Sequence, residues 1–327
     1  MRSYAMLIER TGGPDVIRRS EIDLAAPGPD EVLIKHTAIG LNFVDIYYRS
    51  GQFVGRDALP LPAILGVQAA GIVEQVGARV DALCVGDRVG YVGTPGACAD
   101  RRLIPARKLI TLPDDISDEC AAAAMVRGLA AEYLLRRLYK VQPGETVLIH
   151  AVTGGVGLIL CQWAKSLGAT VIGSVSRDDK TALATEYGCD HAVVHARAGW
   201  VERVLELTGG HGVAVVCDSI GKATFMDSLR CLRRRGTAIN FGTVSGQVEN
   251  FALQALLHKS LTVCRPTLLS FVEDRDEYEA AATDFFDVVR RGIVRIPDAQ
   301  RYDLEAAAQA HTDFEQRRMS AMPVLIP

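Results

Sequence analysis

The chain has 327 residues, of which 49% are apolar and 23% charged, a composition typical of a water-soluble protein of about two domains. A formal net charge of −3 gives no electrostatic basis for binding nucleic acid or an anionic membrane surface. The eight cysteines are scattered and form no C-x-x-C pair, which opposes a disulfide framework or a zinc knuckle. No apolar run approaches the length of a membrane span, so we expect a cytoplasmic protein.

Residues 1–125 are predicted to form many short strands. Apolar stretches such as 31–36, 70–76 and 86–92 are separated by turns that contain glycine and proline. This pattern is typical of a barrel-like β domain.

The pattern changes near residue 120, where helix-forming segments over 118–125 and 128–139 precede a regular alternation. The alternation predicts strands at 146–150, 170–175, 191–194, 213–218 and 236–241, separated by helices at 155–167, 178–187, 199–208 and 222–233. Apolar strands that alternate with helices predict an α/β fold with a doubly wound parallel sheet. A further strand at 261–264 should close the sheet, and Arg233–Arg235 should be a solvated helix end.

Residues 268–327 are too few to form a core of their own, so we expect them to complete the first domain. The expected domains are therefore 1–124 with 268–327, and 125–267.

A glycine-rich segment, A-V-T-G-G-V-G at 151–157, lies between a predicted strand and a predicted helix. Gly154 and Gly157 occupy the second and third glycine positions of G-x-G-x-x-G, whereas Val152 occupies the first and Gly155 is an additional glycine. Such turns also occur as plain connections. The strand before and the helix after favour a dinucleotide site, because a helix N-terminus binds phosphate.

The end of the next strand indicates which dinucleotide binds. NAD sites usually carry an acid about twenty residues after the glycines, whereas this chain has Ser174, Ser176 and Arg177, with Lys180 one turn later. Hydroxyl groups and cations suit a 2′-phosphate, which favours NADPH. The acids at 178–179 count against this interpretation unless they begin the next helix, and Arg177 could instead be a solvated loop cation.

Several motifs resemble one family over essentially the whole chain. They include N-F-V-D-I-Y-Y-R-S-G at 42–51, A-G-I-V at 70–73, the glycine turn at 151–157, D-S-I-G at 218–221 and the terminal L-I-P. Together they resemble the zinc-independent quinone oxidoreductases of the medium-chain dehydrogenase/reductase superfamily, which are similar to zeta-crystallin. The resemblance implies a GroES-like catalytic domain interrupted by a Rossmann domain, with NADPH as hydride donor to a quinone.

Zinc alcohol dehydrogenases of this superfamily carry a G-H-E motif and a cluster of four cysteines. This chain has Gly66-Val67-Gln68 at the first place, and Cys98 stands alone at the second. Because zinc needs several converging nitrogen or sulfur ligands, we expect no metal site. Without a Lewis acid, alcohol oxidation is disfavoured relative to hydride delivery to a quinone or enone.

The resemblance places the substrate between the domains, near Asn42, Asp45, Tyr47 and Arg127, and sets Asn42 and Phe43 against the nicotinamide ribose and ring. Judged from the residues alone, Asn42 could be a turn residue and Asp45 and Tyr47 a surface pair. His195 stands where relatives often have a tyrosine near the 2′-phosphate, although it could be an ordinary surface residue. The other cofactor residues that the resemblance implies are Tyr133, Gly155, Val156, Ser176, Arg177, Lys180, Phe241, Gly242, Thr243, Val244, Arg265, Pro266, Thr267 and Arg317.

Two departures leave the substrate open. Phe53 and Ala130 stand where the family usually has hydroxyl side chains, so enones and haloacrylates remain alternatives to a quinone. A nucleotide-binding structural or regulatory protein without catalysis is a remoter alternative. The apolar strand at 261–264 lacks proline and lysine, so we expect its edge to pair with a second copy in a homodimer. The alternative is a monomer in which a helix at 276–291 covers that edge.

Overall fold

The computed structural model describes residues 1–53, 58–319 and 321–327. The chain forms two compact units, the first from residues 1–126, 274–282 and 296–327, and the second from residues 127–273 and 283–295. Helices α2 (Asp118–Glu132) and α7 (Arg275–Arg290) contribute residues to both units. The second unit includes 283–295, beyond the boundary expected from the sequence, because Phe285 packs where Gly128 has no side chain.

The first unit is built on β-sheets, as the short apolar stretches predict. A seven-stranded sheet has the order β15-β16-β3-β5-β6-β8, with β7 paired to β3, and a smaller sheet has the order β2-β1-β4. The strands are β1 (Arg2–Ile8), β2 (Arg18–Asp23), β3 (Glu31–Gly40), β4 (Ala63–Ile64), β5 (Gln68–Val76), β6 (Arg88–Val92), β7 (Arg101–Pro105), β8 (Ile110–Thr111), β15 (Gln300–Asp303) and β16 (Pro323–Ile326). Their inward side chains form one apolar core, which includes Ile8, Val32, Ile34, Val89 and Ile104.

One helix of the first unit carries candidate site residues, and a second helix packs against it. Helix α1 (Phe43–Ser50) begins at Asn42, just after β3, and ends at Gly51, whose φ of 76° gives the left-handed conformation that glycine adopts without strain. Helix α8 (Ala307–Glu315) lies against it. The Phe43 and Phe314 rings are 4.6 Å apart, and the buried Arg49 forms an ion pair with Glu315.

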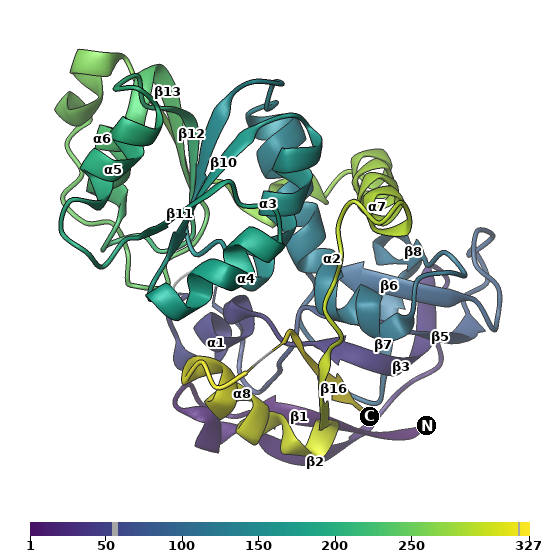
Figure 1. Ribbon diagram of the computed structural model, residues 1–327. Coiled ribbons are helices and arrows are strands. Elements are labelled where there is room, and N and C mark those ends of the chain that lie inside the picture. Colours follow the sequence, from purple (N-terminus) through teal and green to yellow (C-terminus); the bar gives the residue numbers. More distant parts are fainter. Residues whose placement is uncertain (54–57, 320) are drawn as a thin grey trace. The chain divides into compact units, whose positions relative to one another are not determined.

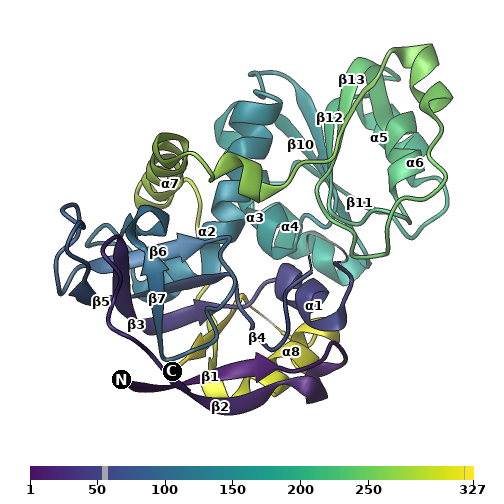
Figure 2. The same cartoon turned by 180° about the vertical axis from the view of Figure 1, so that it is seen from behind.

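The second unit is a doubly wound α/β domain, as the alternation of strands and helices predicts. Its six-stranded sheet has the order β11-β10-β9-β12-β13-β14, and every pairing is parallel. Helices α3 and α4 cover one face of the sheet, and α5 and α6 cover the other (Figures 1 and 2). The elements are β9 (Thr146–Ile149), α3 (Gly155–Ser166), β10 (Thr170–Val175), α4 (Thr181–Glu186), β11 (His191–Val194), α5 (Trp200–Leu207), β12 (Val213–Asp218), α6 (Phe225–Cys231), β13 (Leu232–Asn240) and β14 (Thr262–Cys264).

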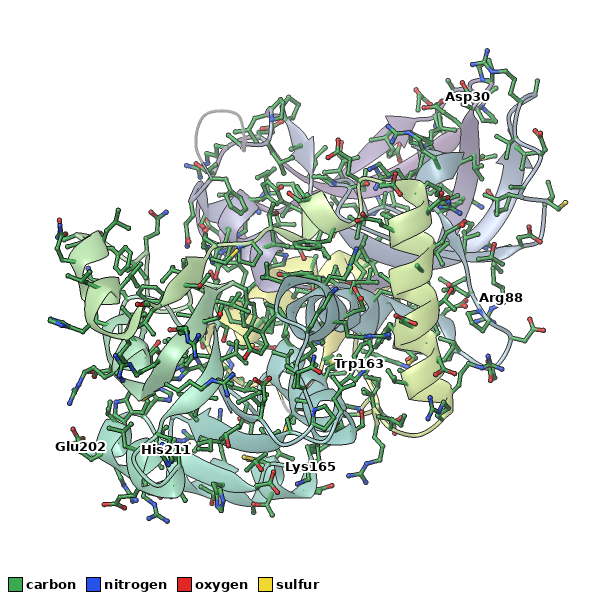
Figure 3. All side chains as sticks on the ribbon, turned by 90° about the horizontal axis from the view of Figure 1, so that it is seen from above. Asp30, Arg88, Trp163, Lys165, Glu202 and His211 are labelled. Atoms are coloured by element: carbon green, nitrogen blue, oxygen red, sulfur yellow. The ribbon has the colours of Figure 1, made fainter. Side chains whose placement is uncertain are left out.

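Helix α3 shows how this sheet is covered. Trp163 is 2% exposed, whereas Lys165, two residues later, pairs with Asp190 at the surface (Figure 3). All eight residues over 157–164 are buried, so this helix is enclosed on every side there, and its exposed residues lie in its last turn. Strand β14 is the terminal strand of the sheet, also as predicted.

The sequence prediction was wrong at one place in this unit. Arg233–Arg235 do not end a helix but lie in β13, because α6 stops at Cys231 and the buried Leu232 already pairs with β12. The three arginines are exposed, and Arg233 forms an ion pair with Glu145. The helix predicted over 128–139 continues α2 but changes at Tyr133–Leu138 to a π-helix, a geometry that often marks functional sites.

Among the residues that the structure describes, none of the helices combines the length and apolar character needed to cross a membrane.

Candidate active site

The glycine turn connects β9 to α3 and leaves the N-terminus of that helix open. Gly154 is the N-cap residue, it is exposed, and no side-chain hydrogen bond caps the helix. The first backbone N–H groups of a helix have no partner within the helix. Together with the helix dipole, these groups form a site suited to a phosphate group.

Steric constraints explain which residues occupy two positions of the turn, Gly157 and Val152. A Cβ on Gly157 would overlap the carbonyl oxygen of Ala151 and lie 2.8 Å from the Val152 Cα, so only glycine allows the helix to pack this closely. Val152 replaces the usual first glycine and is fully buried. Its side chain fits because residue 173 is also a glycine, where a Cβ would lie 2.6 Å from Val152 Cγ1. Gly173 on β10 therefore provides the space that the side chain of Val152 needs in place of the first glycine of the motif.

Arg127 lies next to this turn, in the same unit. It is only 5% exposed, and a Cβ on Gly155 would lie 2.5 Å from its Nε atom. The resemblance assigns Arg127 to the catalytic residues. The structure places it beside the N-terminus of α3, where a guanidinium group is suited to bind an anionic oxygen.

The residues after β10 have the exposure expected of a phosphate site. Ser176 is half-buried, while Arg177 is exposed and donates to Asp179 from Nε at 3.1 Å and from Nη2 at 2.9 Å. Asp178–Lys180 form a short 3-10 helix that begins with the two acids, in line with the expectation that they start a helix. Asp178 pairs with Arg197.

Sequence reasoning missed a buried chain of hydrogen bonds centred on His150, the residue directly before the turn. His150 Nδ1 lies 2.7 Å from Ser174 Oγ, and His150 Nε2 lies 2.9 Å from Ser228 Oγ. Ser174 Oγ lies 3.2 Å from Nδ1 of His195, the candidate phosphate residue. Burial lowers the pKa of His150 to about 4, so its ring is neutral at physiological pH. The position of His150 directly before the turn was the only signal in the sequence.

Two loops at the other half of the sheet carry the remaining candidates. The loop Phe241–Val244 follows β13 and packs on the loop after β12, since Phe241 N donates to Asp218 O at 2.9 Å. Arg265, just after β14, donates from Nη1 to Asn240 O at 2.9 Å, and Pro266 and Thr267 follow it. The candidates in these loops, in the glycine turn and after β10 and β11 all follow the carboxyl ends of parallel strands, the edge where open α/β sheets bind ligands.

Tyr133 begins the π-helix and belongs to an aromatic stack. Its ring lies 4.3 Å from the ring of Phe271, with an angle of 7° between their planes. Burial raises the pKa of Tyr133, so its hydroxyl remains protonated. Arg137 lies over the Phe271 ring at 5.0 Å. No sequence motif indicated Phe271.

In the first unit, the candidates of the 42–51 motif are gathered at the start of α1. Asp45 Oδ2 accepts a hydrogen bond from the Asn42 backbone N–H at 2.7 Å, so its carboxylate caps the helix. Asn42 and Asp45 are both buried, which excludes the surface-pair interpretation for Asp45. The half-buried Tyr47 meets the edge of Phe53, with ring centres 5.9 Å apart. Arg317 is exposed and follows α8.

The place of the zinc ligands in related dehydrogenases is filled by packed side chains. A Cβ on Gly66 would lie 2.8 Å from Cys98 Sγ, and burial raises the pKa of that thiol. Gln68 is fully buried and donates to backbone carbonyl groups. In the described residues, no group of three or more His, Cys, Asp or Glu side chains is placed to hold a metal ion.

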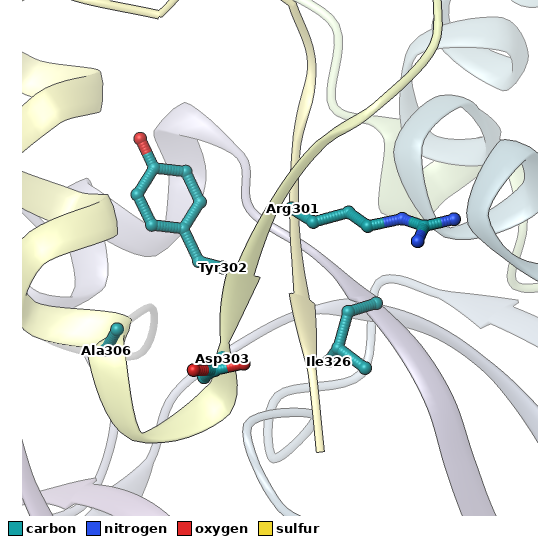
Figure 4. Close-up of a pocket in the computed structure, with 5 residues that line it drawn as sticks. All are labelled: Arg301, Tyr302, Asp303, Ala306 and Ile326. Carbon is teal, nitrogen blue, oxygen red and sulfur yellow. The ribbon is translucent and has the colours of Figure 1, made fainter.

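A shallow pocket near the C-terminus contains none of the candidate residues (Figure 4). It is lined by Arg301, Tyr302, Asp303, Ala306 and Ile326. Arg301 pairs with Glu119, and the Tyr302 hydroxyl donates to Asp313 at 3.1 Å. Most of its polar groups thus already have partners within the chain.

Comparison with known proteins agrees with this arrangement. Residues 28–141 match the family described as alcohol dehydrogenase GroES-like domain, and residues 155–287 match the zinc-binding dehydrogenase family. The chain is 45% identical over 318 residues to a quinone oxidoreductase of Pseudomonas aeruginosa, covering 97% of each chain. It is 40% identical to a 2-haloacrylate reductase of a Burkholderia species, covering 99% of this chain and 98% of the relative. The crystal structure of the Escherichia coli quinone oxidoreductase complexed with NADPH has a TM-score of 0.94 and 40% identity, covering 99% of this chain and all of that one.

Proposed function

Because the chain belongs to the quinone oxidoreductase family, we propose that it is an oxidoreductase that uses NADPH to reduce a quinone. The observation that carries this proposal is the carboxyl edge of the parallel sheet. There an uncapped helix N-terminus lies beside Arg127, and the next strand ends in Ser176 and Arg177 in place of an acid. Relatives from Escherichia coli and a mycobacterium have been solved in complex with NADPH.

Each cofactor-binding residue has a role that follows from its position. The N–H groups of Gly155, Val156 and Gly157 at the start of α3 bind the pyrophosphate, with Arg127 as counter-charge. Ser176, Arg177, Lys180 and His195 follow neighbouring strands and bind the 2′-phosphate. Arg317, in the first unit, is a cofactor residue by the family resemblance alone. The loops 241–244 and 265–267 and the Tyr133 ring hold the nicotinamide end, and the family resemblance assigns its ribose and ring to Asn42 and Phe43.

NADPH supplies the hydride, and the protein orients the acceptor and supports the charge that develops on its oxygen. A quinone that accepts a hydride becomes a hydroquinone anion, which takes its proton from water or from a hydroxyl such as that of Tyr47. An enone or haloacrylate needs more help, because it accepts a hydride at its β-carbon less readily than a quinone does, and the enolate that results must be stabilised until its α-carbon takes a proton. The 2-haloacrylate reductase relative makes this substrate class the second candidate. Replacing Tyr47 by Phe should lower the rate of enone reduction more than the rate of quinone reduction.

Three further properties belong to the proposal. The reaction needs no zinc, because Gly66, Val67 and Gln68 provide no metal ligands. The protein acts in the cytoplasm, since its eight cysteines are free thiols. It forms a homodimer through β14, the terminal strand of the sheet, beside which Leu253 and Leu257 are 72% and 71% exposed.

One set of assays tests the proposal. Consumption of NADPH and NADH is followed with quinones, enals and haloacrylates, before and after exhaustive chelation. We expect NADPH to be preferred, quinones to be reduced and chelation to have no effect. Failure to oxidise NADPH with every acceptor would refute the catalytic proposal, and activity restored by added zinc would refute metal independence. Light scattering should give about twice the chain mass of 35.3 kDa, and the monomer mass would refute the dimer.

A further inference from the structure

The position that carries glutamate in zinc dehydrogenases holds Gln68, and this side chain is hydrogen bonded at both ends of its amide. Gln68 is the first residue of β5 and is 0% exposed. Its Nε2 donates to Ala121 O at 2.9 Å and also to Ala122 O. Its Oε1 accepts from Val126 N–H at 3.2 Å and from Asn42 Nδ2 at 3.1 Å.

The backbone of α2 determines which way the Gln68 amide points. Two carbonyl groups, which only accept, face its nitrogen, and an N–H group, which only donates, faces its oxygen. Turning the amide over would set its oxygen against the Ala121 and Ala122 carbonyl oxygens and its nitrogen against the Val126 N–H. The positions of the Gln68 amide oxygen and nitrogen are therefore determined by their hydrogen-bond partners, although the two atoms are similar in size.

The orientation of the Gln68 amide in turn determines the orientation of the Asn42 amide. Because Gln68 presents its oxygen, Asn42 must present its NH2 group to it, which turns the Asn42 oxygen away from Gln68. The Asn42 NH2 group also donates to Gly40 O at 3.4 Å. In the capping box of α1 the Asn42 side chain accepts from the Asp45 N–H, while the Asp45 carboxylate accepts from the Asn42 backbone N–H, so the amide oxygen keeps one further lone pair. We propose that Gln68 is a positioning residue that directs the amide oxygen of Asn42 toward a hydroxyl group of the nicotinamide ribose. This inference rests on the proposed use of NADPH.

A carboxylate could not perform this role while ionised. At position 68 it would place a negative oxygen against the carbonyl oxygens of Ala121 and Ala122, and burial without a counter-charge is costly. A protonated carboxyl group retains one O–H donor and one carbonyl acceptor, so it reproduces the orientation. The Gln68→Glu variant should consequently behave like the wild type only while its side chain is protonated.

The experiment measures equilibrium binding of NADPH by nicotinamide fluorescence, without a substrate. The proteins are the wild type, Gln68→Leu, Asn42→Ala, their combination, and Gln162→Leu. Gln162 is a matched control, because it is also a buried glutamine bonded to backbone groups, the Leu158 and Arg295 carbonyl oxygens at 3.0 and 3.2 Å. Thermal unfolding of each variant is measured in parallel.

We expect Gln68→Leu to weaken NADPH binding about 3- to 10-fold, the equivalent of one lost hydrogen bond. The same substitution should have no further effect in the Asn42→Ala background, and Gln162→Leu should leave the dissociation constant unchanged. An equal loss with and without Asn42 would overturn the inference, because Gln68 would then act only through stability. Unchanged binding in Gln68→Leu would do the same.

The Gln68→Glu variant keeps the test valid if the leucine variant does not fold. Its affinity for NADPH should match the wild type at low pH and decrease relative to it as the pH rises. An identical pH profile for both proteins would contradict the positioning role. A wild type that does not bind NADPH at all would overturn the proposed function together with this inference, whereas tight binding that ignores Gln68 would overturn only the inference.

Discussion

Two helix N-termini in this protein carry candidate site residues, and they are built in opposite ways. At the start of α1, Asn42 is buried, Asp45 caps the backbone and Gln68 holds the side-chain amide. At the start of α3, the N-cap residue is the exposed Gly154, and no side chain caps the helix. One end is closed by the protein itself, and the other is left open.

The difference shows how similar backbone geometry can serve two kinds of binding. Every α-helix begins with N–H groups that lack partners within the helix. Where an acid such as Asp45 accepts from one of them, the protein itself caps the helix start and holds the neighbouring side chain in place. Where glycine leaves them open, stability is given up so that an anionic ligand can take the place of the cap. The following experiments test this contrast in order of expected effect.

The open end should depend most on its cation. Replacing Arg177 by Gln removes a charge-assisted hydrogen bond to the 2′-phosphate and should weaken NADPH binding roughly 10- to 100-fold, with NADH binding unchanged. Titration with both nucleotides measures this. The matched control is Arg203→Gln, since Arg203 is another exposed arginine in an ion pair, with Glu206. Asp179→Asn should have the opposite sign, because it frees Arg177 from its partner. An equal loss for NADPH and NADH would contradict the assignment.

Gly157 and Gly155 should separate folding from binding at the open end. A methyl group at Gly157 meets backbone atoms of Ala151 and Val152, which cannot move easily, so Gly157→Ala should lower the free energy of unfolding by about 1–3 kcal/mol. A methyl group at Gly155 meets the Nε and Cδ atoms of the buried Arg127, so Gly155→Ala should displace that side chain and weaken NADPH binding, with a smaller loss of stability than Gly157→Ala, which meets backbone atoms. Denaturant unfolding and nucleotide titration measure the two effects. Equal stability losses in both variants would show that the turn is purely structural.

The buried His150, next to the glycine turn, should make the stability of the protein depend on pH. Burial lowers the pKa of His150 to about 4, so the unfolded chain, near 6.5, takes up a proton before the folded one does. The stability contributed by neutral His150 is present above pH 6.5 and is lost as the pH falls toward 4, about 2 kcal/mol between pH 7 and 5. His36 and His311 act in the same direction, with pKa values of about 4 and about 3.

Comparison of the wild type with His150→Gln isolates this contribution. Denaturant unfolding at pH 7 and 5 should show a smaller acid effect in the variant. The exposed His211 (Figure 3) provides the control, because His211→Gln should leave the acid effect unchanged. Parallel curves for the wild type and His150→Gln would show that this ring is protonated as easily in the folded protein as in the unfolded one.

The closed end should respond only modestly. Asp45→Ala removes the carboxylate that caps α1 and should reduce the free energy of unfolding by about 1 kcal/mol. Asp276→Ala, in the first turn of α7, is the control because Asp276 is exposed, and it should change the stability by less than about 0.5 kcal/mol. If the two variants are equally stable, Asp45 does not close the end of α1 in the way that the hydrogen bond indicates.

The sequence by itself determined the parts of this protein that depend on local patterns. Apolar strands alternating with helices predicted the parallel sheet, with β10, β11 and β12 at their observed bounds, because a strand buried on both faces must be apolar throughout. The glycine spacing and the missing acid after β10 predicted a phosphate site for the same local reason. The family resemblance added the candidate residues of the first unit, such as Asn42, Asp45 and Tyr47.

The tertiary structure alone decided which residues support one another across distant segments. Val152 is tolerated because Gly173 lies beside it, and Asn42 is oriented because Gln68 is held by the backbone of α2. The errors at Arg233–Arg235 have the same origin, since the pairing of β13 with β12 overrides the local preference for helix. Hydrogen bonding and close packing between segments far apart in the chain leave no periodic trace in either segment, and for this reason no reading of the sequence reveals them.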